Sequence, residues 1–378
     1  MLIFRRVVAI LLFLFIAMPS LLAPVYRFPP STPFAGSALW NPYAHLTGTW
    51  QKTNLHAHGV AWGGVTNGKQ SDNDVVQAYK QRGYSVAGVS NYGSIAAFHG
   101  VDTIPLYEHG YNVWKVHQLA IGARQVVWLD FPLWQTLDQK QYLIDRVGSE
   151  AELVSLNHPN TAYTDDDMRS LTGYQLMEIV NGPFPVEDLW DTALSNGHVV
   201  WAVGNDDSHD ITNLRRTFIA WNMIDAPSSS AADVIDALRH GRTYAVSLVG
   251  SNPDAALKSV ELDGSTLTIT STGVPATYLF VGQDGTVRET ANQVMQATYT
   301  FAATDTYIRT VVRTPNMVMY INPVIRYDGV RLPVLASGVN ETTTWLHRAF
   351  VLIVSALVTF FLWRRPVKTG RRATDVHA

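Results

Sequence analysis

The segment Leu55-His56-Ala57-His58-Gly59 decides how the fold is interpreted, because it places two histidines two residues apart just after an expected strand. On an extended segment, residues i and i+2 point to the same side, so both imidazoles can approach one cation. A His-x-His pair alone is weak evidence for a metal site. Whether this pair binds a metal depends on which residues lie at the ends of the neighbouring strands.

Further along the chain, other segments place metal-ligand residue types at or just after expected strand ends. They are 104–110 with Glu108 and His109, 116–118 with His117, 156–159 with His158 and Pro159, and 204–209 with Asp206, Asp207 and His209. Each has an ordinary explanation when taken alone: a solvated loop acid, a satisfied core histidine, a turn, or a helix N-cap. Together, so many polar groups at one end of a sheet would be costly to bury without a cation.

The region around these segments alternates short apolar runs with helical stretches. The expected buried strands are 85–90, 153–156, 174–180 and 198–203, and the expected helices include 74–81 and 231–239, the latter ended by Gly241. Repetition of strand, helix and strand is typical of a parallel sheet or barrel, in which chemistry gathers at the carboxyl ends of the strands. The fold class is therefore α/β.

Beyond about Ser251 the pattern changes to short alternating strands between turn signals. These are 260–264, 267–270, 277–281, 298–301 and 307–312. The pattern predicts a small all-β domain, a sandwich, over residues 251–333. Residues 29–44, rich in Pro, Ser and Gly, are interpreted as a linker before the α/β region of residues 45–250.

The order of the motifs resembles that of the PHP (polymerase and histidinol phosphatase) superfamily, in the branch with a β domain after the barrel. The matching residues are His56 and His58, Glu108, His117, His158 with Pro159, and Asp207 with His209. The resemblance covers roughly residues 54–247 and implies a distorted (β/α)7 barrel. It also implies that His56, His58, Glu108 and Asp207 hold one metal, and that Glu108, bridging, holds a second with His117 and His158.

Two departures from the family pattern limit the metal count. Where the family has Asp-His after the second strand, this chain has Asn91-Tyr92. The loop of residues 60–67 lacks the acidic or imidazole ligand that many members place there. We therefore expect two divalent cations, not three. With only nitrogen and oxygen ligands, Zn, Mn or Fe would fit equally.

Several other residues are candidates for catalysis or substrate binding. His209, freed from a third metal, could protonate the leaving group, ligate a metal or orient Asp207. Tyr92 could donate a hydrogen bond or simply pack, and Arg215 and Arg216 could clamp a phosphate or form a solvated pair. Glu178 and Asn181 could orient a ligating imidazole. The aromatic residues Trp62, Tyr107, Trp114 and Trp134 could line a pocket or fill the core.

Composition excludes several classes of protein. The 378-residue chain has a formal net charge of −3, so it lacks the basic surface that nucleic-acid binding needs. It has no cysteine, which excludes a disulfide scaffold, thiolate zinc sites and a cysteine nucleophile. Oligomeric state and the identity of the substrate remain open.

Both ends of the chain carry apolar segments. Residues 1–28, with Arg5 and Arg6 before a long apolar run, predict a signal anchor in preference to a cleaved signal peptide. Residues 345–365 predict a transmembrane helix, although a buried core helix has a similar pattern. The arginines and lysine of the tail, residues 366–378, and Arg5 and Arg6 place both termini in the cytoplasm by the positive-inside rule. The rest of the chain would then lie outside the cytoplasmic membrane.

The sequence thus predicts a membrane-anchored, extracytoplasmic, metal-dependent hydrolase, a phosphoesterase that uses a metal-bridging hydroxide. Its substrate would be a small molecule or a component of the envelope. Two alternatives stay open: a hydrolase of amide-type or carbamate-type bonds, and a binding or scaffold protein that keeps metals for stability without turnover.

Overall fold

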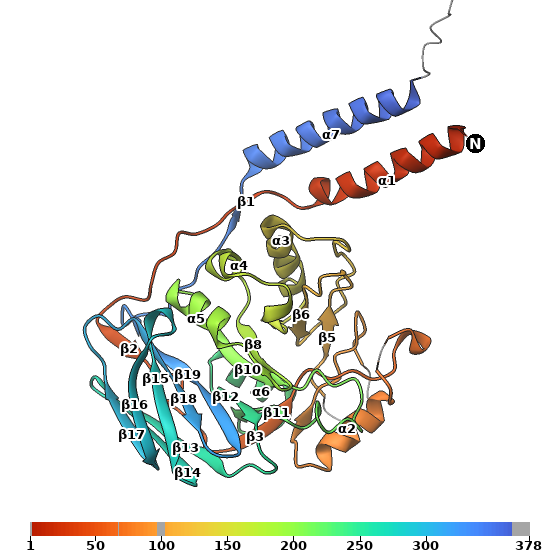
Figure 1. The fold of residues 1–378 in the computed structure, drawn as a ribbon. Coiled ribbons are helices and arrows are strands. Elements are labelled where there is room, and N and C mark those ends of the chain that lie inside the picture. The colour runs from red at the N-terminus through yellow and green to blue at the C-terminus, as the bar shows by residue number, and fades with distance from the viewer. Residues whose placement is uncertain (1, 67, 97–102, 365–378) are drawn as a thin grey trace, which may run out of the picture. The chain divides into compact units, whose positions relative to one another are not determined.

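A computed structural model describes residues 2–66, 68–96 and 103–364 (Figure 1). The chain divides into two compact units. One consists of residues 28–337, and the other combines the residues up to Arg27 with those from Gly338 onward. Each unit is described by itself.

The terminal unit consists of two helices and a small ribbon. Helix α1 (Leu2–Leu22) lies beside α7 (Glu341–Trp363), and β1 (Tyr26–Arg27) pairs antiparallel with β20 (Gly338–Val339). The helices run in opposite directions, because Arg6 Nη1 donates to Trp363 O at 3.1 Å while Arg348 Nε donates to Leu21 O at 3.0 Å. Both are long and apolar enough to cross a membrane, by length and composition only.

The C-terminal helix differs from the predicted span of residues 345–365 at both ends. It begins at Glu341, where the Asn340 side chain caps it by accepting from Thr343 N, and it ends at Trp363. The predicted basic tail of residues 366–378 lies outside the described residues.

In the larger unit, the first sheet has the strand order β10-β8-β7-β6-β5, with β9 paired to β8. Its strands are β5 (Leu106–His109), β6 (Gln118–Ile121), β7 (Leu153–Leu156), β8 (Leu176–Asn181), β9 (Phe184–Pro185) and β10 (Trp201–Asn205). Strands β7, β8 and β10 are parallel and fully buried, as their apolar runs predict.

The expected parallel arrangement does not hold throughout this sheet, because β6 is antiparallel to both β5 and β7. The reason is the connection: only residues 110–117 separate β5 from β6, and a parallel crossover needs a dozen residues or more.

The second sheet has the order β16-β15-β18-β19-β12-β11-β3-β4, with β2 paired to β19. Its strands are β2 (Ala38–Trp40), β3 (Trp50–Asn54), β4 (Val86–Ala87), β11 (Ala220–Asp225), β12 (Thr243–Leu248), β15 (Ala276–Val281), β16 (Val287–Val294), β18 (Tyr307–Arg313) and β19 (Met317–Tyr327). A third sheet contains β13 (Ala255–Asp263), β14 (Thr266–Gly273) and β17 (Gln296–Thr300). The second sheet thus runs from the α/β region into the β region without a break, through the pairing of β12 with β19.

Helices accompany the strands, and all of them except α5 begin after a capping Ser or Thr side chain. They are α2 (Asp72–Lys80), α3 (Leu137–Gly148), α4 (Asp165–Ser170), α5 (Glu187–Ser195) and α6 (Ala231–Arg239), with short 3-10 turns η1 (Trp62–Gly64), η2 (Pro159–Thr161) and η3 (Gln283–Gly285). The Ser230 side chain caps α6, and Gly241, at a positive φ of 73°, follows its end.

The β region packs its third sheet against the second. Buried residues of both sheets, including Leu267 and Ile269 from β14 and Tyr278 and Phe280 from β15, belong to one apolar cluster. The residues interpreted as a linker are also part of this packing, because β2 pairs with β19 and the buried Tyr43 donates its hydroxyl to Thr243 O at 2.6 Å.

Two isolated bridges join the first and second sheets beyond the carboxyl ends of β3 and β4. Ala57 pairs with Ser208, and Tyr92 pairs with Glu108, both in parallel orientation. These bridges bring the ends of several strands to one place, where the predicted ligand residues lie.

Candidate metal centre

The His-x-His segment is held beside Asp207 by its own backbone. His58 N donates to Ser208 O at 2.7 Å, and Asp207 N donates to His56 O at 2.9 Å. Because the segment continues β3 in an extended conformation, the two imidazoles point to the same side. Both histidines are buried.

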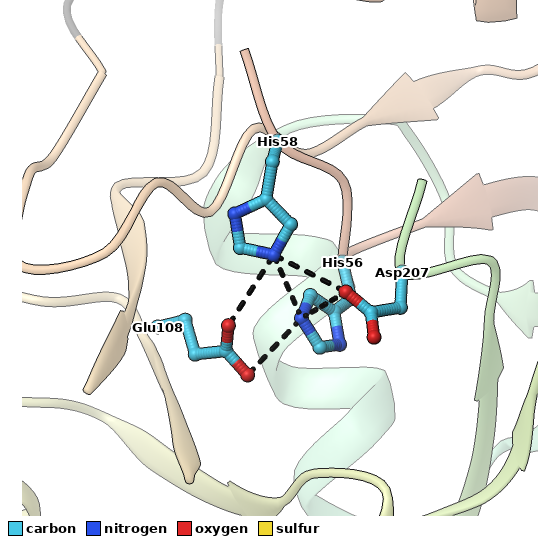
Figure 2. A group of neighbouring side chains, drawn as sticks. All are labelled: His56, His58, Glu108 and Asp207. Carbon is cyan, nitrogen blue, oxygen red and sulfur yellow. Dashed lines mark hydrogen bonds and ion pairs between the residues drawn. The ribbon is translucent and has the colours of Figure 1, made fainter. Parts of the chain in front are cut away.

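Four side chains form a first group of possible ligands, drawn in Figure 2: His56, His58, Glu108 and Asp207. His56 Nε2 lies 3.2 Å from both Asp207 Oδ1 and Glu108 Oε1. His58 Nε2 lies 3.2 Å from Asp207 Oδ1 and from His56 Nε2, and 3.3 Å from Glu108 Oε2. Tetrahedral ligands about 2.0 Å from a cation are separated by about 3.3 Å. The spacing of these atoms therefore fits a shared cation.

A second group shares Glu108 and adds His117 and His158. Glu108 Oε1 lies 3.0 Å from His117 Nδ1 and 3.2 Å from His158 Nε2. All three residues are buried. The structure thus brings together all six residues predicted as metal ligands, with Glu108 between the two groups.

The hydrogen bonds made by Nδ1 of His56 and His158 determine the tautomer of each ring, and hence what Nε2 presents to the cluster. His56 Nδ1 donates to Glu178 Oε1 at 2.9 Å, so the neutral ring turns the lone pair of Nε2 towards Glu108 and Asp207. The Thr161 hydroxyl donates to His158 O at 2.9 Å and therefore accepts from His158 Nδ1 at 3.0 Å. The Nε2 lone pair of His158 then faces Glu108 Oε1. Acceptors that face acceptors need a proton or a cation between them.

Unpaired buried atoms point to the same conclusion. Among the described residues, Glu108 Oε2 and Asp207 Oδ1 are buried and accept no hydrogen bond. Such oxygens are costly to bury unless something positive meets them. The residues present therefore fit divalent cations.

The charges within the cluster shift the pKa values of its imidazoles and carboxylates in opposite directions. Burial lowers the pKa of His56, but the negative charges of Glu108, Glu178 and Asp207 outweigh it and raise that pKa well above its usual value. Burial raises the pKa of Glu108, but the positive charges of His56 and His117 and hydrogen bonds from His117 and His158 hold it well below its usual range. Without metal, protons on the imidazoles compensate the carboxylates.

Glu178 connects the two groups from behind, as the sequence suggested. Its Oε1 accepts from His56 Nδ1, and its Oε2 accepts from His158 N at 2.8 Å. Asn181 Nδ2 donates to Glu178 Oε2 at 2.9 Å and to Asp207 Oδ2 at 3.3 Å. The pair therefore orients a residue of each group.

Two of the possible ligands have a strained backbone. His158 has φ of 29° and Asp207 has φ of 50°, a region that favours glycine. Non-glycine residues in this region cost about 1–3 kcal/mol and gather at functional sites. The surrounding hydrogen bonds hold these residues in place.

The remaining predicted residues lie at different places. His209 stacks on His58 at 4.2 Å between ring centroids, and its Nδ1 donates to Asp207 O at 2.9 Å. Burial and the positive charge of His58 lower the pKa of His209 to about 4. Tyr92 also stacks on His58, with their ring centroids 4.6 Å apart. Arg216 lies over the Phe184 ring at 5.1 Å, and Arg215 is exposed.

Sequence reasoning missed Asn157 and the roles of Asp206 and Asn91. Asn157 Nδ2 donates to Glu108 Oε1 at 3.0 Å, and its position at the end of β7, before His158, was the available signal. Asn91, in place of the family's aspartate, accepts from Gly59 N at 2.9 Å and donates to Asp72 Oδ1 at 3.0 Å. It ties the His-x-His loop to α2.

No protein-family model and no curated protein matches the sequence. Among solved structures, the chain is similar to a two-domain protein containing a predicted PHP-like metal-dependent phosphoesterase from Bacteroides vulgatus ATCC 8482. It has 14% sequence identity and a TM-score of 0.41, and the match covers 83% of this chain and 100% of that chain. The chain is similar to a PHP-like protein with a second domain.

Proposed function

We propose that this protein is a membrane-anchored, metal-dependent phosphoesterase of the PHP type that uses two divalent cations. The observation that carries the proposal is the position of Glu108 between two sets of imidazoles, whose ring nitrogens lie 3.0–3.3 Å from its carboxylate oxygens. Zn, Mn and Fe all suit these ligands. Two cations so held would lower the pKa of a water molecule and polarise a phosphoryl oxygen.

The chain's own residues would position and move protons around this centre. Glu178 holds His56 in the tautomer that presents Nε2 to the cluster. His209 donates from Nδ1 to Asp207 O, so its neutral ring offers Nε2 as a proton acceptor. We assign to this atom acceptance of the proton lost by the attacking water and its delivery to the leaving oxygen. Tyr92, Arg215 and Arg216 would contact the substrate.

The proposed architecture is a distorted PHP-type barrel followed by a β-sandwich. The two bridges, Ala57 to Ser208 and Tyr92 to Glu108, support the barrel because they link the edges of two sheets that are otherwise separate. The apolar cluster shared by the second and third sheets supports the sandwich.

We further propose that α1 and α7 anchor the protein in the cytoplasmic membrane, with the metal centre on its outer face. The most apolar stretches of α1 and α7 are 0% and 6% buried within the protein. Their exposed apolar side chains would be shielded from water by lipid. Arg6 and Trp363 lie together, so Arg5, Arg6 and Arg364 gather at one end of the helix pair. The positive-inside rule places that end, and hence both termini, in the cytoplasm.

The function is tested with the full chain in detergent. Elemental analysis, and turnover of a generic phosphoester and a generic carboxylester, are compared for the parent and for Glu108→Gln and His117→Asn. Both variants should lose metal together with phosphoester turnover. His198→Gln replaces a buried histidine bonded to Arg169 O and serves as the matched control that keeps both.

Other results would favour the alternatives. A parent that holds metal but turns over nothing would support the scaffold reading, and turnover restricted to carboxylester would support the other bond types. Metal near zero in the parent would refute the proposal altogether. For the membrane topology, a cytoplasm-active reporter fused after Ala378 should be active, and activity only of an exported reporter would contradict the orientation.

A further inference from the structure

A pocket of about 490 Å³ opens beside the second ligand group. Tyr92 and His117 form part of its wall, so it adjoins the metal centre directly. Gly110 also lines the pocket, and a Cβ there would lie 2.5 Å from His117 Cδ2, so a side chain at this position would displace a candidate ligand. The volume lies in the range of small-molecule sites.

Aromatic side chains dominate the outer wall. Trp62, Tyr111 and Trp128 line the pocket and are 51%, 59% and 59% exposed. The rings of Trp62 and Trp128 meet edge to face, with centroids 5.6 Å apart. Large exposed aromatic surfaces gathered at one cavity mark binding sites more often than chance scatter does.

Several polar groups of this wall are already bonded within the protein. Trp62 Nε1 donates to Tyr92 O at 2.8 Å, and the Tyr111 hydroxyl donates to Trp128 O at 3.0 Å. His109 is bonded at both ring nitrogens, to Gln118 Oε1 and Leu129 O. The wall therefore offers a ligand mainly ring faces and carbon.

Backbone strain gathers at the same place. Trp62 has φ of 54° and Lys115 has φ of 56°, and both line the pocket. Strain of this kind persists where function requires a fixed side-chain position. Lys115 is also the cation of this wall, whose described lining residues include no carboxylate.

We propose that this pocket binds the organic group of the substrate, and that this group is aromatic. The physiological substrate would then be a phosphoester of an aromatic-ring compound, with its phosphoryl group at the metal centre and its ring against the aromatic wall of Trp62, Tyr111 and Trp128. Ring stacking and edge contacts favour a planar aromatic group over an alkyl chain of similar size. This inference rests on the proposed phosphoesterase function.

Binding of phosphonates to the metal-loaded full chain tests it by calorimetry, with no turnover required. Benzylphosphonate, hexylphosphonate and methylphosphonate share the charged group and differ only in the organic part. Benzylphosphonate should bind roughly tenfold or more tightly than methylphosphonate, with hexylphosphonate between them. Trp128→Ala should remove most of this preference. Trp134→Ala, a similarly exposed tryptophan at 53% outside the pocket lining, should keep it.

The outcomes separate this inference from the proposed function. Equal affinities of the parent for benzylphosphonate and methylphosphonate, or no binding of either, would overturn the aromatic pocket, whatever the turnover assay shows. Tighter binding of hexylphosphonate than benzylphosphonate would overturn the aromatic class in favour of an alkyl or lipid group. A Trp128-dependent benzyl preference without phosphoester turnover would keep the pocket and refute the phosphoesterase.

Discussion

Replacing Glu178 by Gln should weaken metal binding although Glu178 belongs to neither ligand group. The carboxylate is fully buried and accepts four hydrogen bonds: from His56 Nδ1 and Asn205 Nδ2 at Oε1, and from His158 N and Asn181 Nδ2 at Oε2. A glutamine amide has one oxygen, so one of these pairs of donors would meet an NH2 group.

Either orientation of the amide disturbs the centre. If the NH2 group faces His56, the ring relieves the clash by moving its proton from Nδ1 to Nε2, and the metal-facing lone pair is lost. If the NH2 group faces the backbone of His158, this ligand shifts. Removal of such supporting bonds typically costs 10- to 100-fold in metal affinity, which is about 1.4–2.8 kcal/mol.

The assay is metal titration of the full chain, with the free energy of unfolding measured without metal. Asp225→Asn is the matched control. Asp225 is equally buried and accepts from Thr47 N at 2.6 Å, but it pairs with Trp50 at the opposite end of β3 from the histidines. The control should lose stability and keep metal affinity. A folded Glu178→Gln variant with parental metal affinity would refute the reasoning.

Further predictions concern individual histidines. Because carboxylates raise the pKa of His56, metal binding near pH 7 should release about one proton or more per chain, measured by calorimetry in buffers of different ionisation enthalpy; no release would contradict the protonated cluster. Burial lowers the pKa of His198, so the contribution of this histidine to stability is present above about pH 6.5 and is lost as the pH falls below that value. In His198→Gln, the midpoint of denaturant unfolding should therefore decline less towards acid pH than in the parent. An unchanged decline would show that His198 does not cause the acid-side loss of stability.

Part of the ligand set could be predicted from strand ends, because His56, His158 and Asp207 follow β3, β7 and β10. The assignment of all six residues to two cations came from the resemblance to the PHP pattern, since Glu108 lies within β5 and His117 precedes β6. The direction of β6 could not be predicted in this way, since an apolar run has no direction and only the short connection after β5 fixes it.

The aromatic residues were less predictable, because pocket and core use the same side chains. Tyr107 is fully buried, and its hydroxyl accepts from Val127 N at 2.9 Å, whereas Trp62 lines the pocket and Trp114 and Trp134 are exposed outside its lining. Which of these a tryptophan becomes depends on how its loop is turned, and the positive φ of Trp62 leaves no periodic signal in the sequence.

The adjacent residues Asp206 and Asp207 direct their carboxylates to different places, because Asp207 has a positive φ. Asp206 accepts from the Tyr79 hydroxyl at 2.7 Å and from the amides of Phe218, Ile219 and Ala220, so its acceptors serve the fold. Asp207, at φ of 50°, turns its Oδ1 into the cluster, where no hydrogen bond meets it.

The two substitutions to asparagine should therefore have opposite effects. Asp206→Asn leaves donors unpaired and should lower the free energy of unfolding of the metal-free protein by about 1–3 kcal/mol, with metal affinity per folded chain retained. Asp207→Asn removes a ligand charge and should abolish tight binding to the first group, whatever it costs the metal-free fold through the lost ion pairs with His56 and His58. Unfolding and metal titration of the two variants side by side measure both effects. If Asp206→Asn lost metal and Asp207→Asn did not, the two roles would have to be exchanged, and with them the identity of the fourth residue around the shared cation.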